Sequence, residues 1–464
     1  MKKKVISVLL TMAMVASLTA CGGGSNGGDS AADSGEAATE NAPADAGSDA
    51  APADDGAAVT EGASADDNTL TVWTWDPNFN VYAINKAAEI YAKDHEGFKV
   101  EVSEVQSDDI ETRITTAVSA RDLSTLPDIL LMQDNSFQKY VINYPDVYTD
   151  LTSSEIDFSQ FSSAKVAYST IDGKNYGIPF DNGTVINCVR TDILEQAGFT
   201  VDDFTDITWS DYMEKAKVVL EKTGVPMLTA QAGSPDQVMM MLQSCGSSLF
   251  NADGTVNIDG NAELKEIMNI YVQMVKDGTL VEVTDWDQYI ASLNNGTAAS
   301  AMNGCWIMAS ITPVEDQSGK WALTNMPKLD TISGATNYSN NGGSSWAITS
   351  NCQKVDLAVD FMNSTFAGST ELYDDVISKG ALATWAPAGE SEAYAQPVDF
   401  FGGDAIYAKI VEYATQTPSN ITGAYYYDAR DAVGVALSNV CQQGADIDAE
   451  IKTAQETVEF NMGG

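Results

Sequence analysis

The chain has 464 residues, of which 66 are acidic, 24 are basic and one is histidine, and its formal net charge is −42. This excess of carboxylates disfavours nucleic acid and anionic lipid surfaces as partners, because both repel a strongly negative protein. The single His95 and six scattered cysteines, with no Cys-x-x-Cys pair, argue against zinc, haem and Cys–His chemistry. We therefore expect neither a metal nor a cofactor.

Residues 1–20 have the layout of a signal peptide. Lys2 to Lys4 precede an apolar stretch, and the chain then reaches Cys21 through small and apolar residues. The segment Leu18-Thr19-Ala20-Cys21 resembles the bacterial lipobox. This resemblance implies that Cys21 becomes a lipidated first residue, which anchors the protein.

The next predicted segment is a disordered acidic linker over residues 21–68, which begins with the lipidated cysteine. After Cys21 it contains eleven acidic side chains and no aromatic, Lys or Arg residue, so it cannot bury enough apolar surface to fold. No later apolar run approaches the roughly 20 residues of a membrane span, and the lipid is therefore the only expected membrane contact. The predicted location is the outer face of the cell membrane, and the long linker favours a Gram-positive envelope.

The folded part, from residue 69 onward, is too long for one hydrophobic core, since single cores stop growing near roughly 250–300 residues. Strand-like runs at 69–75, 98–103 and 129–132 alternate with helical periodicity at 84–91 and 108–120. This β-α-β-α-β order predicts an open parallel sheet with helices on both faces. We expect two α/β lobes.

Polar and aromatic side chains follow two of these strands. Trp75 and Asp76 come after the first strand, and Asp134 and Asn135 come after the third. Ligands of such sheets bind outside the carboxyl ends of the strands, so we expect these four residues at the edge of a cleft. Helix capping is a comparable role for Asp134 and Asn135.

A long extended stretch after residue 177 carries the polar pair Asp181 and Asn182 in its middle. A strand of this kind can pass from one lobe to the other as a hinge. We expect Asp181 and Asn182 to serve either as ligand groups or as hinge-turn residues.

Residues 285–308 resemble a signature of the family 1 extracellular solute-binding proteins, the maltose-binding-protein-like sugar receptors of ABC importers. The shared pattern is a helix ended by Gly296, a short strand of small residues, and the turn Gly304-Cys305-Trp306. The family often has Gly-Pro-Trp in this turn, so Cys305 is a departure that leaves the aromatic residue in place. Further matching segments occur in the family's order over residues 69–464, and they are Leu126–Ile129, Tyr176–Pro179, Asn325–Pro327 and Gly380–Ala383.

The resemblance implies a periplasmic-binding-protein type II fold, in which two α/β lobes joined by hinge crossings close on a ligand held between them. It also implies a small neutral sugar as ligand, the transmembrane permease subunits of an ABC importer as partners, and a monomer without enzymatic activity. On this basis we expect the first lobe to comprise residues 69–181 with 327–379. The second lobe would then comprise residues 182–326 with 380–464.

In the family, aromatic rings stack on sugar faces, and the resemblance points to several such rings here. Trp306 is the first candidate, and Trp346 follows small residues that would let a ligand approach the backbone. Trp286, with Asp287 beside it, opens a helix and is otherwise a core aromatic. One tyrosine among Tyr425, Tyr426 and Tyr427 is expected to face the cleft, and the sequence does not distinguish them.

Other classes of function remain open at this point. A cell-surface glycosidase would need two carboxyl groups across the scissile bond, and an adhesin or sensory lipoprotein could share the fold. An amino-acid or peptide receptor would favour an arginine clamp, but Arg113, Arg121, Arg190 and Arg430 stand in no evident cleft motif. A neutral sugar fits better, although its identity, length and linkage cannot be inferred from the sequence.

Overall fold

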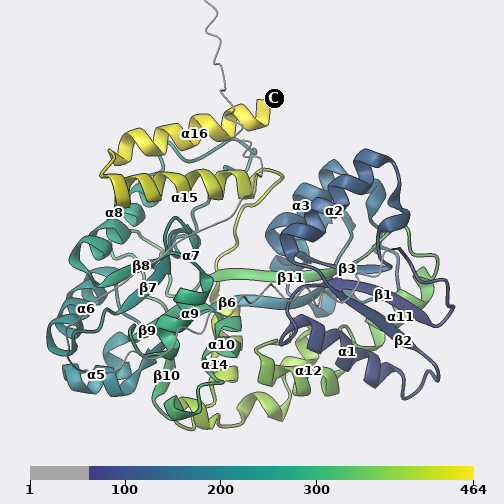
Figure 1. The fold of residues 1–464 in the computed structure, drawn as a ribbon, viewed down its shortest axis with the longest axis horizontal. Helices are drawn as coiled ribbons and strands as arrows, with labels where there is room; N and C mark the ends of the chain where they lie inside the picture. Colours follow the sequence, from purple (N-terminus) through teal and green to yellow (C-terminus); the bar gives the residue numbers. More distant parts are fainter. Residues whose placement is uncertain (1–61, 464) are drawn as a thin grey trace, which may run out of the picture. The chain divides into compact units, whose positions relative to one another are not determined.

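The structure, a computed structural model, describes residues 62–463 (Figure 1). The predicted signal peptide, Cys21 and most of the predicted linker lie outside the described residues. The end of that linker, residues 62–68, is bound to the folded part. The Gly62 N–H donates to the Thr125 carbonyl at 2.9 Å, and Lys354 Nζ donates to the carbonyls of Ser64 and Asp66 at 2.8 and 2.9 Å. The fold therefore includes residues that were predicted to belong to the linker.

The first lobe begins with the predicted β-α-β-α-β order, which is confirmed. Strands β1 (Thr69–Thr74), β2 (Lys99–Glu104) and β3 (Ile129–Gln133) are parallel, with β1 in the middle. Helices α1 (Asn80–Tyr91) and α2 (Ser107–Ala120) connect them, and α1 buries the apolar face predicted from its periodicity. The other elements of this lobe are α3 (Asp134–Asn143), α4 (Ser163–Ala167), β4 (Thr170–Ile171), β5 (Lys174–Asn175), α11 (Val355–Ser364), α12 (Thr370–Val376) and α13 (Ala386–Gly389).

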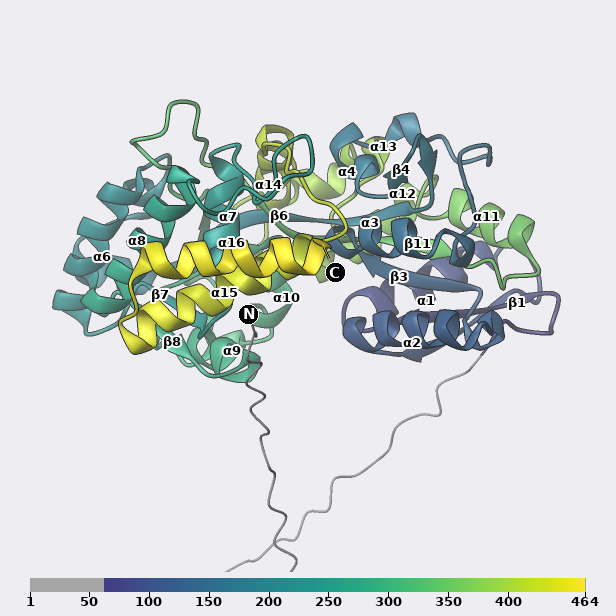
Figure 2. The same ribbon diagram turned by 90° about the horizontal axis from the view of Figure 1, so that it is seen from above.

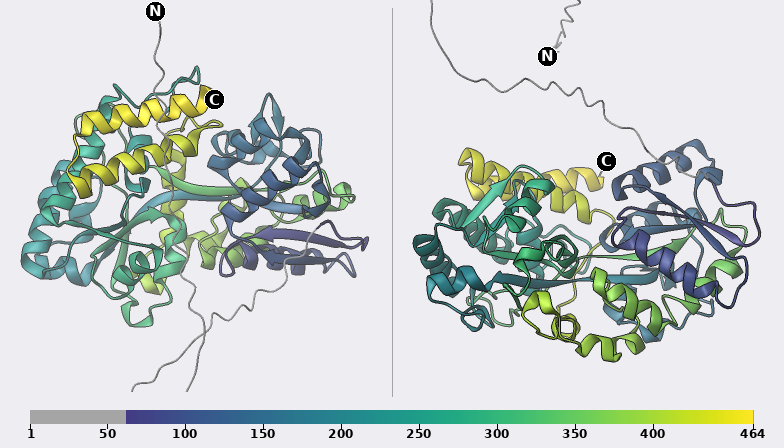
Figure 3. Two further views of the ribbon diagram at one scale, coloured as in Figure 1. Left: turned by 45° about the horizontal axis from the view of Figure 1, so that its top comes forward. Right: turned by 60° about the horizontal axis from the view of Figure 1, so that its bottom comes forward.

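Two long strands, β6 (Ile178–Arg190) and β11 (Asn340–Ile348), connect the halves of the molecule (Figures 1 and 3). They pair antiparallel in a seven-stranded sheet of order β10-β6-β11-β3-β1-β2, in which β9 also pairs with β6. The added strands are β9 (Ser300–Gly304) and β10 (Trp321–Thr324). Ile178 packs in the first lobe's core and Val189 in the second's, so β6 is the predicted crossing strand.

The second lobe adds a parallel pair, β7 (Leu228–Gln231) and β8 (Leu280–Val283). Its long C-terminal helices, α15 (Tyr426–Gln443) and α16 (Ile447–Gly463), lie side by side, as Figure 2 shows. None of the helices within residues 62–463 is long and apolar enough to cross a membrane. The helices of this lobe are α5 (Thr191–Ala197), α6 (Trp209–Thr223), α7 (Asp236–Ser244), α8 (Ala262–Asp277), α9 (Trp286–Asn294), α10 (Met308–Ile311), α14 (Ile406–Gln416), α15 (Tyr426–Gln443) and α16 (Ile447–Gly463).

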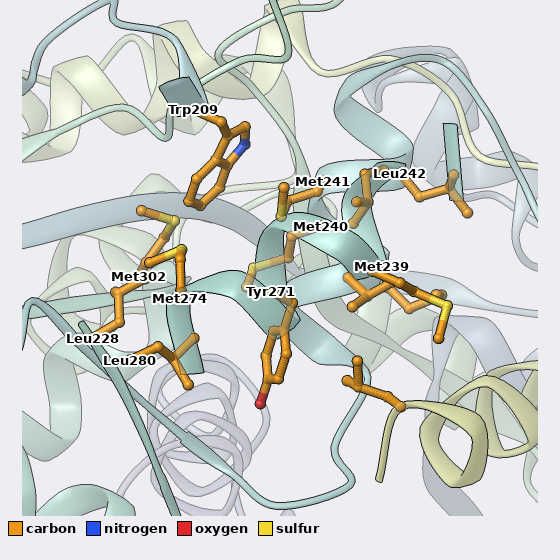
Figure 4. Packing of buried hydrophobic residues seen from close by; sticks show 14 of the residues in the cluster. Trp209, Leu228, Met239, Met240, Met241, Leu242, Tyr271, Met274, Leu280 and Met302 are labelled. Carbon is orange, nitrogen blue, oxygen red and sulfur yellow. The ribbon is translucent and has the colours of Figure 1, made fainter. Parts of the chain in front are cut away.

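The core of the second lobe is rich in methionine. Trp209 and Tyr271 pack among these sulfur side chains (Figure 4), which are Met239, Met240, Met241, Met274 and Met302. The unbranched thioether adapts to irregular space. This lobe therefore fills its interior with side chains that can shift their packing.

The chain crosses between the lobes at positions that differ from the predicted boundaries. Met326 and Leu329 pack in the second lobe's core, and Asn337 Nδ2 donates to the Ile207 carbonyl at 2.9 Å. The passage back to the first lobe is therefore β11 itself, which starts at residue 340 and not at 327. Ala381 and Ala388 lie in the first lobe's core, whereas Ile377 and Leu382 lie in a cluster of the second lobe, so residues 377–388 contact both lobes and no single crossing falls at residue 379.

Strands β6 and β11 approach one another closely at Gly183. A Cβ atom added there would lie 2.0 Å from the Asn341 carbonyl oxygen and 2.9 Å from the Gly342 carbonyl carbon. Both contacts are with backbone, which cannot rotate away, so only glycine permits this approach.

We expect Gly183→Ala to lower the free energy of unfolding by about 1–3 kcal/mol, because the added methyl group must push the strands apart. Chemical denaturation measures this change. The matched control is Gly389→Ala in α13, where an added Cβ meets nothing within 4 Å and the expected change is below about 1 kcal/mol. Equal effects of the two substitutions would contradict the close approach.

Candidate binding site

A cavity of about 540 Å³ lies at the junction of the two lobes and the crossing strands. This volume is within the range of small-molecule sites. The first lobe contributes Trp75, Asp76, Phe79, Asn80, Asp108, Gln133 and Asn135, the crossing strands contribute Asp181 and Asn341–Ser344, and the second lobe contributes Asp236, Trp286, Trp306, Ala309, Ser310, Tyr427 and Arg430.

Trp306 is held in one orientation by the backbone of β11. It lies in a short helical turn that follows β9, and its indole Nε1 donates to the Asn341 carbonyl at 2.8 Å. A Cβ atom on Gly304 would lie 2.3 Å from that nitrogen. The Gly-x-Trp turn therefore needs glycine at its first position to bring the ring against the strand.

Trp286 extends the aromatic wall of the second lobe. Its ring centroid lies 5.8 Å from that of Trp306 at an interplanar angle of 46°, and it stacks on Tyr289 at 5.1 Å. Despite these two ring contacts, the large apolar side chain of Trp286 is exposed where it lines the cavity. A ring in this state is available for contact with a ligand.

Asn80 positions the strand end that carries Trp75 and Asp76. Its side chain is fully buried, and its Oδ1 accepts from the backbone N–H groups of Trp75 and Asp76 at 3.2 and 2.9 Å. It also accepts from Thr74 Oγ1 at 2.6 Å. Three donors on one oxygen fix the turn between β1 and α1, and this turn presents both predicted residues to the cavity.

A buried ionic cluster supports the floor formed by β6 and β11. Lys165 Nζ contacts the Asp134 carboxylate and donates to the Ser344 carbonyl at 2.8 Å, while Ser344 Oγ donates to Asp181. Ser345 Oγ also donates to Asp134 at 3.0 Å. Burial raises the pKa of Asp134 to about 6 and also raises the pKa of Asp181, against the opposing effect of Lys165.

One guanidinium lines the cavity, that of Arg430 in the second lobe, and it already has a carboxylate partner. Arg430 forms an ion pair with Asp236, and its guanidinium lies over the Tyr427 ring at 5.5 Å. Tyr427 OH donates to Gln133, and Lys139 Nζ lies 3.5 Å from the Asp428 carboxylate. Helix α15 of the second lobe therefore contacts the first lobe beside the cavity.

Six of the predicted residues line the cavity, and they are Trp75, Asp76, Asn135, Asp181, Trp286 and Trp306. Six others do not. Among these, Trp346 is fully buried, with its ring centroid 5.4 Å from that of Phe180 and 5.5 Å from that of Phe366. The expectation that Trp346 faces a ligand is therefore wrong for this structure, because its side of the strand packs in the first lobe's core.

Local contacts explain why the other predicted residues do not line the cavity. Asp134 is engaged by Lys165, Asn182 pairs with Gly343 in the β6–β11 ladder, and Asp287 is exposed on α9 outside the cavity. Tyr425 packs against the second lobe's core and Tyr426 is buried, whereas Tyr427 lines the cavity. Of the three candidate tyrosines, Tyr427 is therefore the one found in the cavity lining.

Several lining residues were not predicted, and they are Phe79, Asn80, Asp108, Asp236, Ala309, Ser310, Asn341, Gly342, Gly343, Ser344 and Arg430. Arg430 lines the cavity although it stands in no evident cleft motif of the sequence. A signal was present, since Arg430 follows Tyr427 by three residues and such a pair shares one helix face. Asp236 had no signal of this kind, because its partner lies 194 residues away.

Residues 86–400 match the family model described as bacterial extracellular solute-binding protein. This chain belongs to that family. The Lactose-binding protein of Rhizobium radiobacter is 36% identical over 388 residues, which cover 83% of this chain and 91% of that protein. The Arabinooligosaccharide-binding protein of Bacillus subtilis strain 168 is 24% identical over 308 residues, 65% of this chain and 69% of that protein.

Solved structures share the fold of this family member. An ABC transporter associated binding protein from B. animalis subsp. lactis Bl-04, in complex with beta-1,6-galactobiose, gives a TM-score of 0.70 at 22% identity, covering 84% of this chain and 96% of that one. A maltose-bound protein of T. maritima gives 0.69 at 16% identity, covering 84% and 99%. The family and the two-lobed fold expected from the sequence are confirmed.

We expect Lys165→Ala to lower the free energy of unfolding at pH 7.5 by about 3–5 kcal/mol, because it leaves buried carboxylates without their cation. The loss should be smaller at pH 5. The pKa of Asp134 is about 6 in the folded protein against an ordinary 3.8, so the folded state binds the proton more tightly and acidification through this window favours folding.

Denaturation at the two pH values measures the effect of Lys165→Ala. The control is Lys174→Ala, which removes an exposed ion pair with Asp150 at 3.2 Å and should cost less than about 1 kcal/mol. An equal loss at pH 5 and pH 7.5 would rule out the carboxylates as its cause.

Proposed function

We propose that this protein is the receptor of an ABC-type importer, that it binds a neutral mono- or oligosaccharide in the cavity, and that it delivers the sugar to membrane permease subunits. The observation that carries this proposal is a cavity with exposed tryptophan on its wall and carboxylates and amides around it. A pyranose has an apolar C–H face for the rings and a rim of hydroxyl groups for the polar side chains. Relatives named for lactose and arabinooligosaccharide support the sugar class.

The 36% identity to a lactose-binding relative makes β-galactosides the first ligands to test. Within the cavity, Trp306 and Trp286 are the proposed stacking surfaces, and Asp76, Asn135 and Asp181 are the proposed acceptors and donors for hydroxyl groups. The contacts of Tyr427 and Lys139 across the lobes are consistent with closure around the sugar.

We further propose that the protein works outside the cell as a lipid-anchored monomer. Residues 1–20 would direct export and Cys21 would carry the lipid. The acidic linker would hold the binding lobes away from the outer face of the membrane, across a Gram-positive wall. Radiolabelled palmitate should enter the wild type and not Cys21→Ser.

We also propose binding without cleavage. The alternative is a glycosidase. Asp181 is the residue that would favour this alternative, because a glycosidase needs a cavity carboxyl group with a raised pKa as its catalytic acid. In this protein, however, Asp181 already accepts from Ser344 and lies near Lys165, which suits a fixed hydrogen-bonding group.

The test is a thermal-shift screen of the chain without its signal peptide and lipid, against lactose, other saccharides, amino acids and peptides. A ligand at a hundred times its dissociation constant should add about 2.7 kcal/mol of stability. Stabilisation by a saccharide that is recovered intact would support the proposal. Stabilisation by amino acids or peptides alone would remove the sugar, and recovery of shortened sugar would indicate an enzyme.

We expect Trp306→Ala to weaken binding of the sugar by about ten- to a hundredfold, because truncation of a stacking aromatic removes its contact area. Isothermal titration calorimetry measures the change. Trp306→Phe keeps an apolar ring but loses the indole N–H donated to Asn341, so it should retain more affinity than Trp306→Ala. Unchanged affinity in a folded Trp306→Ala variant would remove this ring from the site.

A further inference from the structure

Asp236 and Arg430 form the one ion pair among the residues that line the described cavity. Asp236 is the first residue of α7, and Arg430 lies in the second turn of α15. Both side chains keep access to solvent, with 31% and 24% of their surface exposed. The pair is therefore within reach of a bound solute.

We propose that Asp236 occupies the carboxylate-binding side of Arg430 and thereby makes the cleft select neutral sugars and reject sugar acids. The inference rests on the proposed function, because it concerns which saccharides the cavity accepts. It assigns to Asp236 a role in specificity that neither its position in the sequence nor its neighbours along the chain would suggest.

The geometry of Arg430 would otherwise suit a carboxylate. A guanidinium presents a planar fork of donors that matches the two oxygens of a carboxylate. Here Nη2 contacts Asp236, and Nη1 lies 3.9 Å from Asp431. The ring of Tyr427 packs beneath the guanidinium, so the group cannot easily turn away toward another partner.

The remaining charges of the cavity oppose an anion. The lining contains four carboxylates, those of Asp76, Asp108, Asp181 and Asp236, and one guanidinium. Lys165 adds no free cation, since its side chain is 2% exposed and contacts Asp134. A sugar carboxylate in this cavity would meet uncompensated negative charge, whereas a neutral sugar can donate its hydroxyl groups to the same oxygens.

A purely structural ion pair predicts a different outcome. If the pair only joined α7 to α15, its loss would lower stability and weaken all ligands alike. If it masks Arg430, then replacing Asp236 by its neutral isostere frees the guanidinium, and sugar acids gain affinity while neutral sugars do not. The direction of change for the two kinds of sugar separates these roles.

The experiment compares the wild type with Asp236→Asn by isothermal titration calorimetry. The probes are matched pairs of a neutral sugar and its C6 carboxylate: galactose and galacturonate, lactose and its 6′-carboxylate, and cellobiose and cellobiouronate. The wild type should bind the neutral member of at least one pair and bind its acid at least about a hundredfold more weakly. In Asp236→Asn, the acid should gain about tenfold or more, and added salt should reduce that gain.

Asp431→Asn is the matched control, because it removes the same charge from a carboxylate near Arg430 that does not line the cavity. It should leave both members of the pair close to their wild-type affinities. Circular dichroism and thermal melting establish that Asp236→Asn is folded, and if that variant does not fold, Asp236→Ser serves in its place.

The outcomes are distinct. Equal affinity of the wild type for a sugar and its acid, or no gain for the acid in folded Asp236→Asn, overturns the role of Asp236 and leaves the sugar receptor intact. Failure of every neutral and acidic sugar to bind the wild type overturns the proposed function, and this inference with it.

Discussion

The antiparallel pairing of β6 with β11 places both lobes on one continuous sheet, and the cavity is built on it. The strands touch backbone to backbone at Gly183, and the carbonyl of Asn341 beside this contact accepts from the indole of Trp306. On the first-lobe side, Lys165 ties the Asp134 carboxylate to the β11 carbonyl of Ser344. Two residues of β11 thus hold the two sides of the cavity in place: Asn341 positions the Trp306 ring, and Ser344 positions Lys165 and its carboxylate partner.

The features that the sequence predicted are those with a local or periodic origin. The order of strands and helices in the first lobe can be predicted from the spacing of apolar residues. The position of Trp75 and Asp76 can be predicted because the sequence shows both the end of the strand and the turn that follows it. The Gly-x-Trp turn is local as well, since its glycine and its tryptophan are two residues apart. The sequence therefore predicts Trp306 at the cavity through the family signature that contains this turn.

The site residues that were predicted wrongly or missed depend on strand register or on contacts between residues far apart in the sequence. Trp346 follows glycines much as Trp306 does, but the ladder between β11 and β6 shifts register between Asn340 and Gly343 and again between Ser344 and Ser345. The first of these shifts has its extra residue on β11 and changes the face that later β11 side chains occupy, so alternation could not assign Trp346. Asp236 and Arg430 meet only through the packing of α7 and α15, which no local pattern encodes.

The attachment of the chain's entry segment has a mechanical consequence. Lys354 holds the carbonyls of Ser64, Asp66 and Thr69, and Asp128 accepts from the N–H groups of Ser64 and Thr71. All of these anchoring groups belong to the first lobe or lead into it. A force applied to residues 62–69 is therefore transmitted to the first lobe, and the second lobe is not held by this segment.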